Sequence, residues 1–282
     1  MDVDLFRRLE RRYLFTGELD MRTALHLGGG DGTLGSTDSP VVRRPDGQPF
    51  IPGSSLKGAF RSTVEKLALT LDLPNMERDA IDQAADWIKD FNQRRREQGW
   101  TEEQTVQQVS AAWPVTAHLF GTPYTASKLS FSDAYLCPKQ ESIVQRRDGV
   151  AIDRDSERAM DRLKYDYEVV PASVRFNFEL LLENPGPVDL GLTCLGLSEL
   201  CSGLLSLGGK RSSGLGRCIL VAPQAYELDL RSNVNDPKQR AERLIRYLRG
   251  TSPAEKFDAI ADFDSWLNLH IGALLNKGKE MA

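Results

Sequence analysis

Three glycine-containing segments of the sequence carry the residue types that could do chemistry. The first, GGGDGTLGSTDSPVV, places two carboxylates, Asp31 and Asp38, in a loop after a strand-like stretch. A loop carboxylate can act as a base, position a nucleophile or bind a divalent cation. Aspartate is also common in turns without any chemical role, and the segment alone favours that simpler interpretation.

The second segment, IPGSSLKGAFR, combines a proline-glycine turn with the start of a helix. Ser54, Ser55 and Lys57 fall in its first turn, and Arg61 follows one turn later. Backbone N–H groups at a helix N-terminus, with hydroxyls and an ammonium beside them, suit an anion such as phosphate. The alternative is that Ser54 or Ser55 is an ordinary helix cap and Lys57 is a solvated side chain.

The third segment, GGKRSSGLGR, precedes the last strand of the expected core. Gly208 and Gly209 allow close approach of the backbone to a ligand, and Lys210, Arg211 and Arg217 supply charge for phosphates. The spacing does not match a Walker loop, and a strand rather than a helix follows, which argues against a dinucleotide fingerprint. A flexible connection is an equally good interpretation of the segment.

The elements that must position these segments form an α+β pattern. In chain order we expect a strand at 13–27, a helix from about 54 with Leu56, Phe60, Val64, Leu67 and Leu71 on its apolar face, strands at 128–137 and 168–183, a helix at 196–207 and a strand from 218. This order is the split β-α-β of ferredoxin-like and RNA-recognition-motif folds, an antiparallel sheet backed by two helices.

The expected core, residues 12–230, contains two insertions and is followed by a tail. Residues 74–116 are typical of a helical insertion, with apolar positions at helical spacing and a capping box at Thr101 and Gln104. Residues 138–166 are a charged excursion too long for a turn. Residues 231–282 are a helical extension, where Asp236-Pro237 and Ser252-Pro253 each predict a helix start. Its expected buried positions are Leu244, Ile245, Leu248, Phe257, Ile260, Trp266, Ile271 and Leu274.

Composition excludes several classes of protein. The four cysteines are scattered and there are only three histidines, so a zinc site, a disulfide framework or a multi-histidine centre is not expected. This cysteine usage fits a reducing cytoplasm. The charged N-terminus lacks the features of a signal peptide, and no apolar run is long enough to span a membrane. The net charge of −4 leaves local basic surfaces as the possible nucleic-acid contacts.

Taken together, the loop with STDSPVVR, the helix start IPGSSLKGAFR and the late GGKRSSGLGR resemble the RAMP superfamily. The resemblance is strongest to the repeating backbone subunit of type III CRISPR effector complexes. Residues 149–180 also agree, because their AIDR and EVVP sequences are similar to the thumb hairpin and following strand of that subunit. The resemblance covers most of residues 12–223.

The resemblance implies a function. Such subunits stack along a guide RNA, and the thumb of each copy distorts the guide–target duplex so that a loop aspartate, with a divalent metal expected to be Mg²⁺, cleaves the target. Asp38 occupies the position of that aspartate, and Asp31 is not matched. The partners implied are guide RNA, target RNA, other subunits of the complex and further backbone copies, with no membrane. The implied RNA contacts are Ser54, Ser55, Lys57, Arg61, Gly208, Gly209, Lys210 and Arg211, and His26 is a further candidate.

Two related alternatives remain open. One is a structural backbone that binds the same guide RNA without cleaving the target. The other is a guide-processing endoribonuclease, which would need His26, although such enzymes lack the IPGSSLKG helix start. A phosphotransferase using the glycine loops is not supported, because no Walker loop or acidic metal cluster is present.

Overall fold

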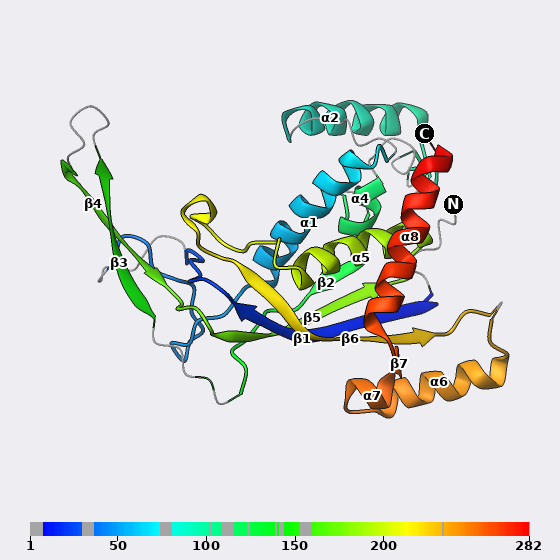
Figure 1. Ribbon diagram of the computed structural model, residues 1–282. Coiled ribbons are helices and arrows are strands. Elements are labelled where there is room, and N and C mark those ends of the chain that lie inside the picture. The colour runs from blue at the N-terminus through cyan, green and yellow to red at the C-terminus, as the bar shows by residue number, and fades with distance from the viewer. Residues whose placement is uncertain are drawn as a thin grey trace.

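The computed structural model describes residues 8–29, 37–73, 81–101, 103–105, 107–108, 115–122, 125–138, 140, 144–152, 159–232 and 234–281. Its centre is a five-stranded sheet in the order β2-β5-β1-β6-β7, with every neighbouring pair antiparallel (Figure 1). The strands are β1 (Arg11–Met21), β2 (Leu129–Phe131), β5 (Arg175–Glu183), β6 (Cys218–Asp229) and β7 (Asp258–Ala259). The order β2-β5-β1-β6 within this sheet confirms the ferredoxin-like arrangement.

The helices divide between the two faces of this sheet. On one face lie α1 (Gly53–Thr70), α4 (Val115–Phe120), α5 (Pro187–Cys201) and α8 (Phe263–Met281), whereas α6 (Pro237–Arg249) and α7 (Pro253–Lys256) lie on the other (Figure 1). The main core fills the space beneath the first group. Its strand residues alternate along the chain, as a half-buried sheet requires, and include Phe15, Leu19, Phe176, Phe178, Leu180 and Leu182.

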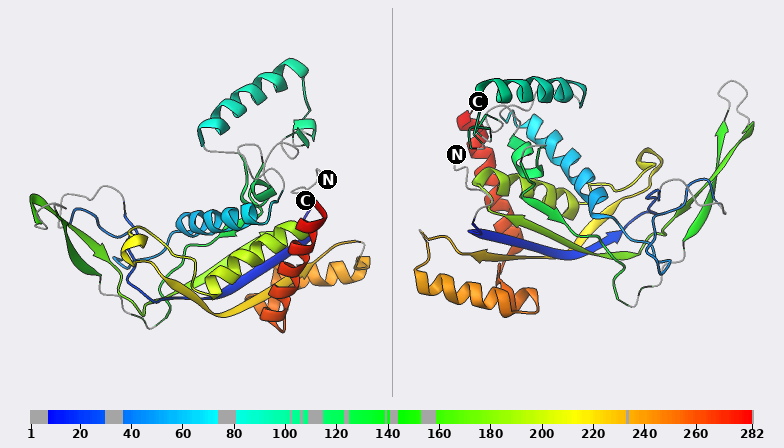
Figure 2. Two further views of the ribbon diagram at one scale, coloured as in Figure 1. Left: turned by 45° about the horizontal axis from the view of Figure 1, so that its top comes forward. Right: turned by 180° about the vertical axis from the view of Figure 1, so that it is seen from behind.

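Two additions extend beyond this core. The strands β3 (Gln145–Ile152) and β4 (Ala159–Val169) form a separate antiparallel hairpin that projects from the end of the sheet opposite α8 (Figure 2). The helix α2 (Ile81–Gln98) lies outside the helical layer. After it, Thr101 and Gln104 exchange side-chain to backbone hydrogen bonds of 3.0 and 3.2 Å, which confirms the predicted capping box. The apolar positions expected for the helix after this capping box, Val106, Val109 and Trp113, lie outside the described residues.

The stretch at 168–183 is not one strand. β4 continues to Val169 and β5 begins only at Arg175. Between them Pro171 has no N–H for a sheet hydrogen bond, and Ser173 has a φ of 66°. Residues 167–169 therefore belong to the hairpin. The expected strand at 13–27 is likewise shorter, because regular pairing stops at Met21 and only isolated bridges follow at Leu25 and Gly28.

The second core helix begins earlier than expected. Proline occupies the first position of α5, and the N–H of Gly186 donates to Asp189 Oδ2 at 2.8 Å. Residues 190–194 are all buried, so the helix has no polar face that would have shown a helical period. For this reason the predicted span of 196–207 captured only its C-terminal end.

The tail differs from the expectation in two ways. Ser252-Pro253 starts a helix as predicted, but α7 is a single turn, after which Phe257 is extended and buried. The long helix instead begins at Phe263, after Asp262 accepts a hydrogen bond from the N–H of Ser265 at 3.0 Å. In α6, the apolar residues Leu244, Ile245 and Leu248 are 40%, 49% and 70% exposed rather than buried.

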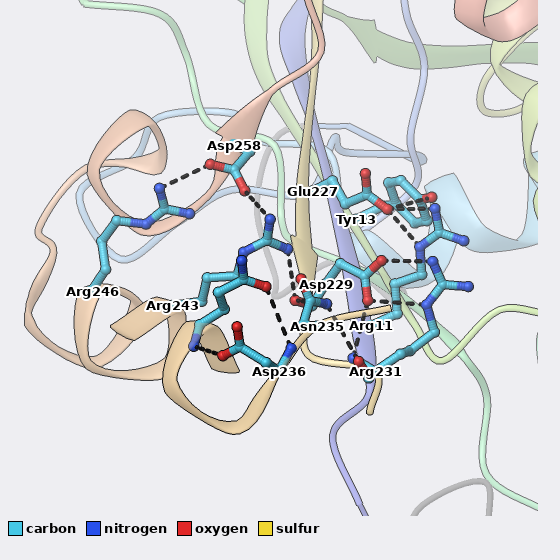
Figure 3. A network of polar contacts seen from close by, with 11 residues as sticks. Arg11, Tyr13, Glu227, Asp229, Arg231, Asn235, Asp236, Arg243, Arg246 and Asp258 are labelled. Carbon is cyan, nitrogen blue, oxygen red and sulfur yellow. Dashed lines mark hydrogen bonds and ion pairs between the residues drawn. The ribbon is translucent and has the colours of Figure 1, made fainter. Parts of the chain in front are cut away.

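Polar contacts, rather than the leucines, attach α6 to the sheet (Figure 3). Arg243 donates to the carbonyl of Asp229 at 2.9 Å, and Arg246 pairs with Asp258 at 2.8 Å. At the end of β6, Arg231 forms an ion pair of 2.6 Å with the side chain of Asp229. Within the described ranges, no helix has the length and apolar character needed to cross a bilayer.

Candidate functional site

Asp38 lies where its loop meets the base of the β3–β4 hairpin. The N–H of Asp38 donates to Asp166 Oδ1 at 2.7 Å, and the N–H of Asp166 donates to Asp38 Oδ2 at 3.1 Å. Ser39 then pairs in parallel with Tyr167, and its carbonyl accepts from the N–H of Glu168 at 3.0 Å. The loop is thus held along one edge of β4.

The two aspartates of this contact differ in exposure. Asp38 is exposed, whereas Asp166 is only 8% exposed and its Oδ2 forms an ion pair with Arg146 of β3. The Asp38 side chain is therefore the carboxylate that a ligand can reach. Asp31, the other candidate of this loop, lies outside the described residues.

A second carboxylate, Glu168, fixes the continuation of the loop. Its Oε2 accepts from the N–H of Val41 and from Arg43, both at 3.0 Å. Its backbone carbonyl lies 2.7 Å from Nδ1 of His26, and the His26 ring meets Tyr167 edge-on at 5.6 Å. His26 is buried in this position, so its contacts in the described chain are those of a link between the segment that follows β1 and the hairpin.

The late glycine loop reaches the same place. The N–H of Gly209 donates to the His26 carbonyl at 3.0 Å. A Cβ at Gly208 would lie 2.2 Å from that carbonyl oxygen, and the φ of Gly208 is 75°, so only glycine fits there. Lys210 follows with its Nζ over the rings of Tyr165 and Tyr167, 4.5 and 4.4 Å from their centroids. Arg211 is exposed at the start of a short 3₁₀ turn, Arg211–Ser213.

The start of α1 differs from the prediction in how it is capped. Neither Ser54 nor Ser55 caps the helix, which begins at Gly53. Asp133, 80 positions along the chain, accepts the Gly53 N–H at 2.7 Å. A Cβ at Gly53 would lie only 2.3 Å from the Phe131 carbonyl oxygen, which explains the close approach of helix and β2. The two serine hydroxyls are therefore not used by the cap.

The Asp133 carboxylate accepts the first N–H of α1, but it does not balance the charge of the side chains in the first turn. The first turn of α1 contains no acidic residue. Burial lowers the pKa of Lys57 from its ordinary value, and the positive charge of Arg61 lowers it further. Arg61 has its own ion-pair partner in Glu65 at 2.7 Å, whereas Lys57 has none among the described residues. A phosphate would supply the missing negative charge.

The predicted site residues thus form two groups. The first group gathers around β4, where the segment after β1, the Asp38 loop and the late glycine loop meet the hairpin. It consists of Asp38, His26, Gly208, Gly209, Lys210 and the adjoining Arg211. The α1 group consists of Ser54, Ser55, Lys57 and Arg61. Within the described chain, no hydrogen bond or ion pair joins the two groups directly.

Residues of β4 were missed as site residues by the sequence analysis. In KYDYEVV, the aromatic and acidic side chains alternate, so Tyr165 and Tyr167 face Lys210 while Asp166 and Glu168 face the Asp38 loop. This alternation of aromatic and acidic residues was visible in the sequence. It could have identified a strand whose two faces have different partners.

The donor set around Asp38 suits a cation only in a limited way. No cluster of three or more metal-binding side chains occurs in the described residues. Both carboxylate oxygens of Asp166 already have partners. A hard cation such as Mg²⁺ would accept one oxygen from Asp38, provided that water and phosphate oxygens complete its shell.

Comparison with known proteins agrees with this geometry. The sequence model of the RAMP superfamily matches residues 18–219. The CRISPR system Cms endoribonuclease Csm3 of Enterococcus italicus is 30% identical over 211 residues, 72% of this chain and 88% of that protein. The protein of the same name from Streptococcus thermophilus is 25% identical over 225 residues, 72% of this chain and 84% of that protein.

A shorter match is closer in sequence. The Csm3 endoribonuclease of Methanothermobacter thermautotrophicus is 43% identical over 61 residues, which are 21% of this chain and 25% of that protein. The superfamily match covers all the elements that meet around β4, from the Asp38 loop to the late glycine loop. With that coverage, and with a ferredoxin-like sheet carrying these loops, the chain belongs to the RAMP superfamily.

Proposed function

We propose that this chain is the guide-RNA-binding backbone subunit of a type III CRISPR effector complex, and that it cleaves complementary target RNA at regular intervals. The observation that carries the proposal is an exposed carboxylate, Asp38, fastened to the base of a projecting hairpin. The names of the relatives, which are CRISPR-system endoribonucleases, support the same function. Its partners would be guide RNA, target RNA, other subunits and further copies of this chain.

The hairpin at 145–169 is the thumb in this proposal. It projects from the end of the sheet (Figure 2), where it can insert beside a guide–target duplex and displace a nucleotide. Regular A-form geometry does not place a 2′-hydroxyl in line with its own phosphodiester, and displacement of one nucleotide permits that alignment. The fixed contact between the thumb and the Asp38 loop would keep the displaced phosphodiester beside the carboxylate.

The chemistry asked of the protein is modest, because the RNA brings its own nucleophile. The 2′-hydroxyl oxygen forms a new bond to phosphorus as the bond from phosphorus to the 5′-oxygen breaks, which leaves a 2′,3′-cyclic phosphate and a 5′-hydroxyl. The proton lost by the 2′-hydroxyl is balanced by the proton that the leaving 5′-oxygen takes up from water. Asp38 would orient the hydroxyl and assist that proton transfer. A bound Mg²⁺ would supply stabilisation of the charge that develops on the phosphate oxygens.

The two groups of predicted RNA contacts have separate tasks in this proposal. Lys57, with its lowered pKa, and the serine hydroxyls of the α1 start would hold guide phosphates. The backbone at Gly208 and Gly209 and the side chains of Lys210 and Arg211 would hold phosphates nearer the thumb. Sequence selection would come from base pairing, with the protein contacting backbone and shape.

The proposal predicts a metal-dependent cleavage that requires Asp38. In the assembled, guide-loaded complex with Mg²⁺, we expect Asp38→Asn to lower the cleavage rate of a labelled complementary RNA by at least about 100-fold. Asparagine keeps an acceptor for the Asp166 N–H, so the loop contact should survive. Guide content and target affinity should equal those of the wild type.

The matched control is Asp46→Asn, which changes another exposed loop aspartate, whose partners are the N–H of Gln48 at 3.0 Å and Arg44 at 3.6 Å in its own turn. Cleavage at unchanged speed by Asp38→Asn would remove Asp38 from the mechanism. A wild-type complex that binds the target tightly and leaves it uncut with Mg²⁺ present would identify a structural backbone without nuclease activity.

A further inference from the structure

Asp166 is a buried acid that connects the β3–β4 hairpin to the Asp38 loop. It lies at the point where β4 leaves the hairpin, opposite Asp148 of β3, and is 8% exposed. The two carboxylates share the guanidinium of Arg146, which lies 4.0 Å from Asp148 Oδ1 and pairs with Asp166 Oδ2. The other partner of the Asp166 side chain lies outside the hairpin, in the Asp38 loop.

Both carboxylate oxygens of Asp166 are committed to other groups. Oδ1 accepts the N–H of Asp38 at 2.7 Å, and Oδ2 pairs with the guanidinium of Arg146. Asp166 is therefore not placed to take a proton from the RNA or to bind a cation. What its side chain does is fix the backbone of one residue, Asp38.

The return contact acts on the Asp38 side chain itself. The N–H of Asp166 donates to Asp38 Oδ2 at 3.1 Å, which fixes the rotation of that carboxylate. Within the described chain, Oδ1 of Asp38 has no hydrogen-bond partner. The pair of contacts thus orients one oxygen toward β4 and leaves the other for a ligand.

We propose that Asp166 is a positioning residue that sets the place and rotation of the Asp38 carboxylate, and that Arg146 orients Asp166 from the neighbouring strand. The inference rests on the proposed function of Asp38. It adds a direct connection between the thumb and the cleavage site, since Arg146 and Asp166 both belong to the thumb strands.

The test measures single-turnover cleavage by guide-loaded complexes that carry Asp166→Ala, Asp166→Asn, Arg146→Ala or Arg147→Ala. We expect Asp166→Ala to slow cleavage by about 100-fold, the effect of a displacement of about 1 Å at a reacting group. Asp166→Asn keeps an acceptor for the Asp38 N–H and should recover the rate to within about 10-fold of wild type, the cost of weakening one hydrogen bond.

Arg147 provides the matched control for Arg146. It is the next residue of the same strand, carries the same charge, is exposed and lies opposite Tyr167, and within the described part of the chain it forms no ion pair with Asp166. Arg146→Ala should slow cleavage, whereas Arg147→Ala should not. A loss of target affinity that is equal in the two variants would result from the removal of one positive charge. Guide content and target affinity are measured for each complex, so that a merely structural defect is recognised.

The outcomes separate this inference from the proposed function. If wild type cuts and Asp38→Asn does not, but Asp166→Ala cuts at the wild-type rate, the positioning role is wrong and the nuclease stands. Equal loss in Asp166→Ala and Asp166→Asn, with target binding intact, would assign Asp166 a direct chemical role instead. Should Asp166→Ala fail to assemble, Asp166→Asn and the Arg146/Arg147 pair still decide. An uncut target with wild type removes both ideas.

Discussion

The two core helices differ in how the charges at their starts are paired, although the helices occupy equivalent places in the fold. Each follows a central strand, α1 after β1 and α5 after β5, and each starts at a proline-glycine pair. In α5 the first turn contains Asp189, whose Oδ2 pairs with Lys128 at 2.5 Å, with side chains 9% and 6% exposed. In α1 the first turn has no acid, and Lys57 has no carboxylate partner among the described residues.

The difference separates a structural helix start from one that is available to a ligand. The positive end of α5 is neutralised inside the protein by its own carboxylate, and the lysine that balances that carboxylate is buried with it. The positive end of α1 has the Asp133 carboxylate on its first N–H, but Lys57 in the first turn has no carboxylate partner among the described residues, and burial lowers the pKa of its ammonium. Substituting the same residue type at both helix starts tests this comparison directly.

The largest expected effect is on the α5 side. Lys128→Met leaves Asp189 buried without its partner, and we expect the free energy of unfolding to fall by about 3–5 kcal/mol, the usual cost of breaking a buried pair. Urea unfolding of the purified chain measures this loss. The double variant Lys128→Met/Asp189→Asn removes the buried charge while keeping an acceptor for Gly186, and should recover most of it.

The comparison would fail if Lys57→Met were as damaging to stability as Lys128→Met. It would also fail if the double variant were no more stable than the single one, because the loss would then come from packing and not from an unpaired charge.

The intermediate effect is on RNA binding at α1. We expect Lys57→Met to weaken binding of guide RNA and to lower the slope of log affinity against log salt by about 1, the signature of one lost phosphate contact. Filter binding or fluorescence anisotropy over a series of salt concentrations gives both quantities. Lys66→Met, on the exposed part of the same helix, is the control for a general loss of charge. An unchanged salt slope for Lys57→Met would contradict a phosphate contact there.

The smallest expected effect is the pH dependence of stability that Lys57 causes. Because its pKa in the folded chain lies below the ordinary 10.5, the unfolded chain binds more protons between the two values. Stability from this group therefore rises with pH across that interval. The melting temperature of Lys57→Met should be slightly higher than that of the wild type at about pH 7, and the difference between them should shrink toward about pH 10. Thermal unfolding at both pH values, with Lys66→Met as the reference, measures it.

Much of the fold could be predicted because its signals are local. Alternation along 218–229 and helical spacing from Leu56 to Val64 depend on residues close together in the chain, and both elements are present. The α5 start escaped prediction because a helix buried on all sides has no polar period. In α6 the spacing of Leu244, Ile245 and Leu248 indicated an apolar face, but spacing cannot tell whether anything covers that face.

Prediction of the candidate site succeeded and failed for the same reason. The segments that hold Asp38, Lys57 and Lys210 could be selected by residue type and spacing, whereas their environments depend on contacts between distant parts of the chain. The cap on Gly53 comes from Asp133, 80 positions away, and the partner of Asp38 is Asp166, 128 positions away. No local pattern encodes such pairs, so the capping role expected for Ser54 or Ser55 was wrong.

The pairing between Ser39 and Tyr167 also bears on how this protein can vary through evolution. Side chains along β4 alternate between the Asp38 loop and Lys210, so a single inserted residue near Tyr167 would exchange the two faces. Insertions or deletions at that end of the thumb are tolerable only in steps of two. Changes of thumb length among descendants of this sequence should therefore accumulate away from this end of the hairpin.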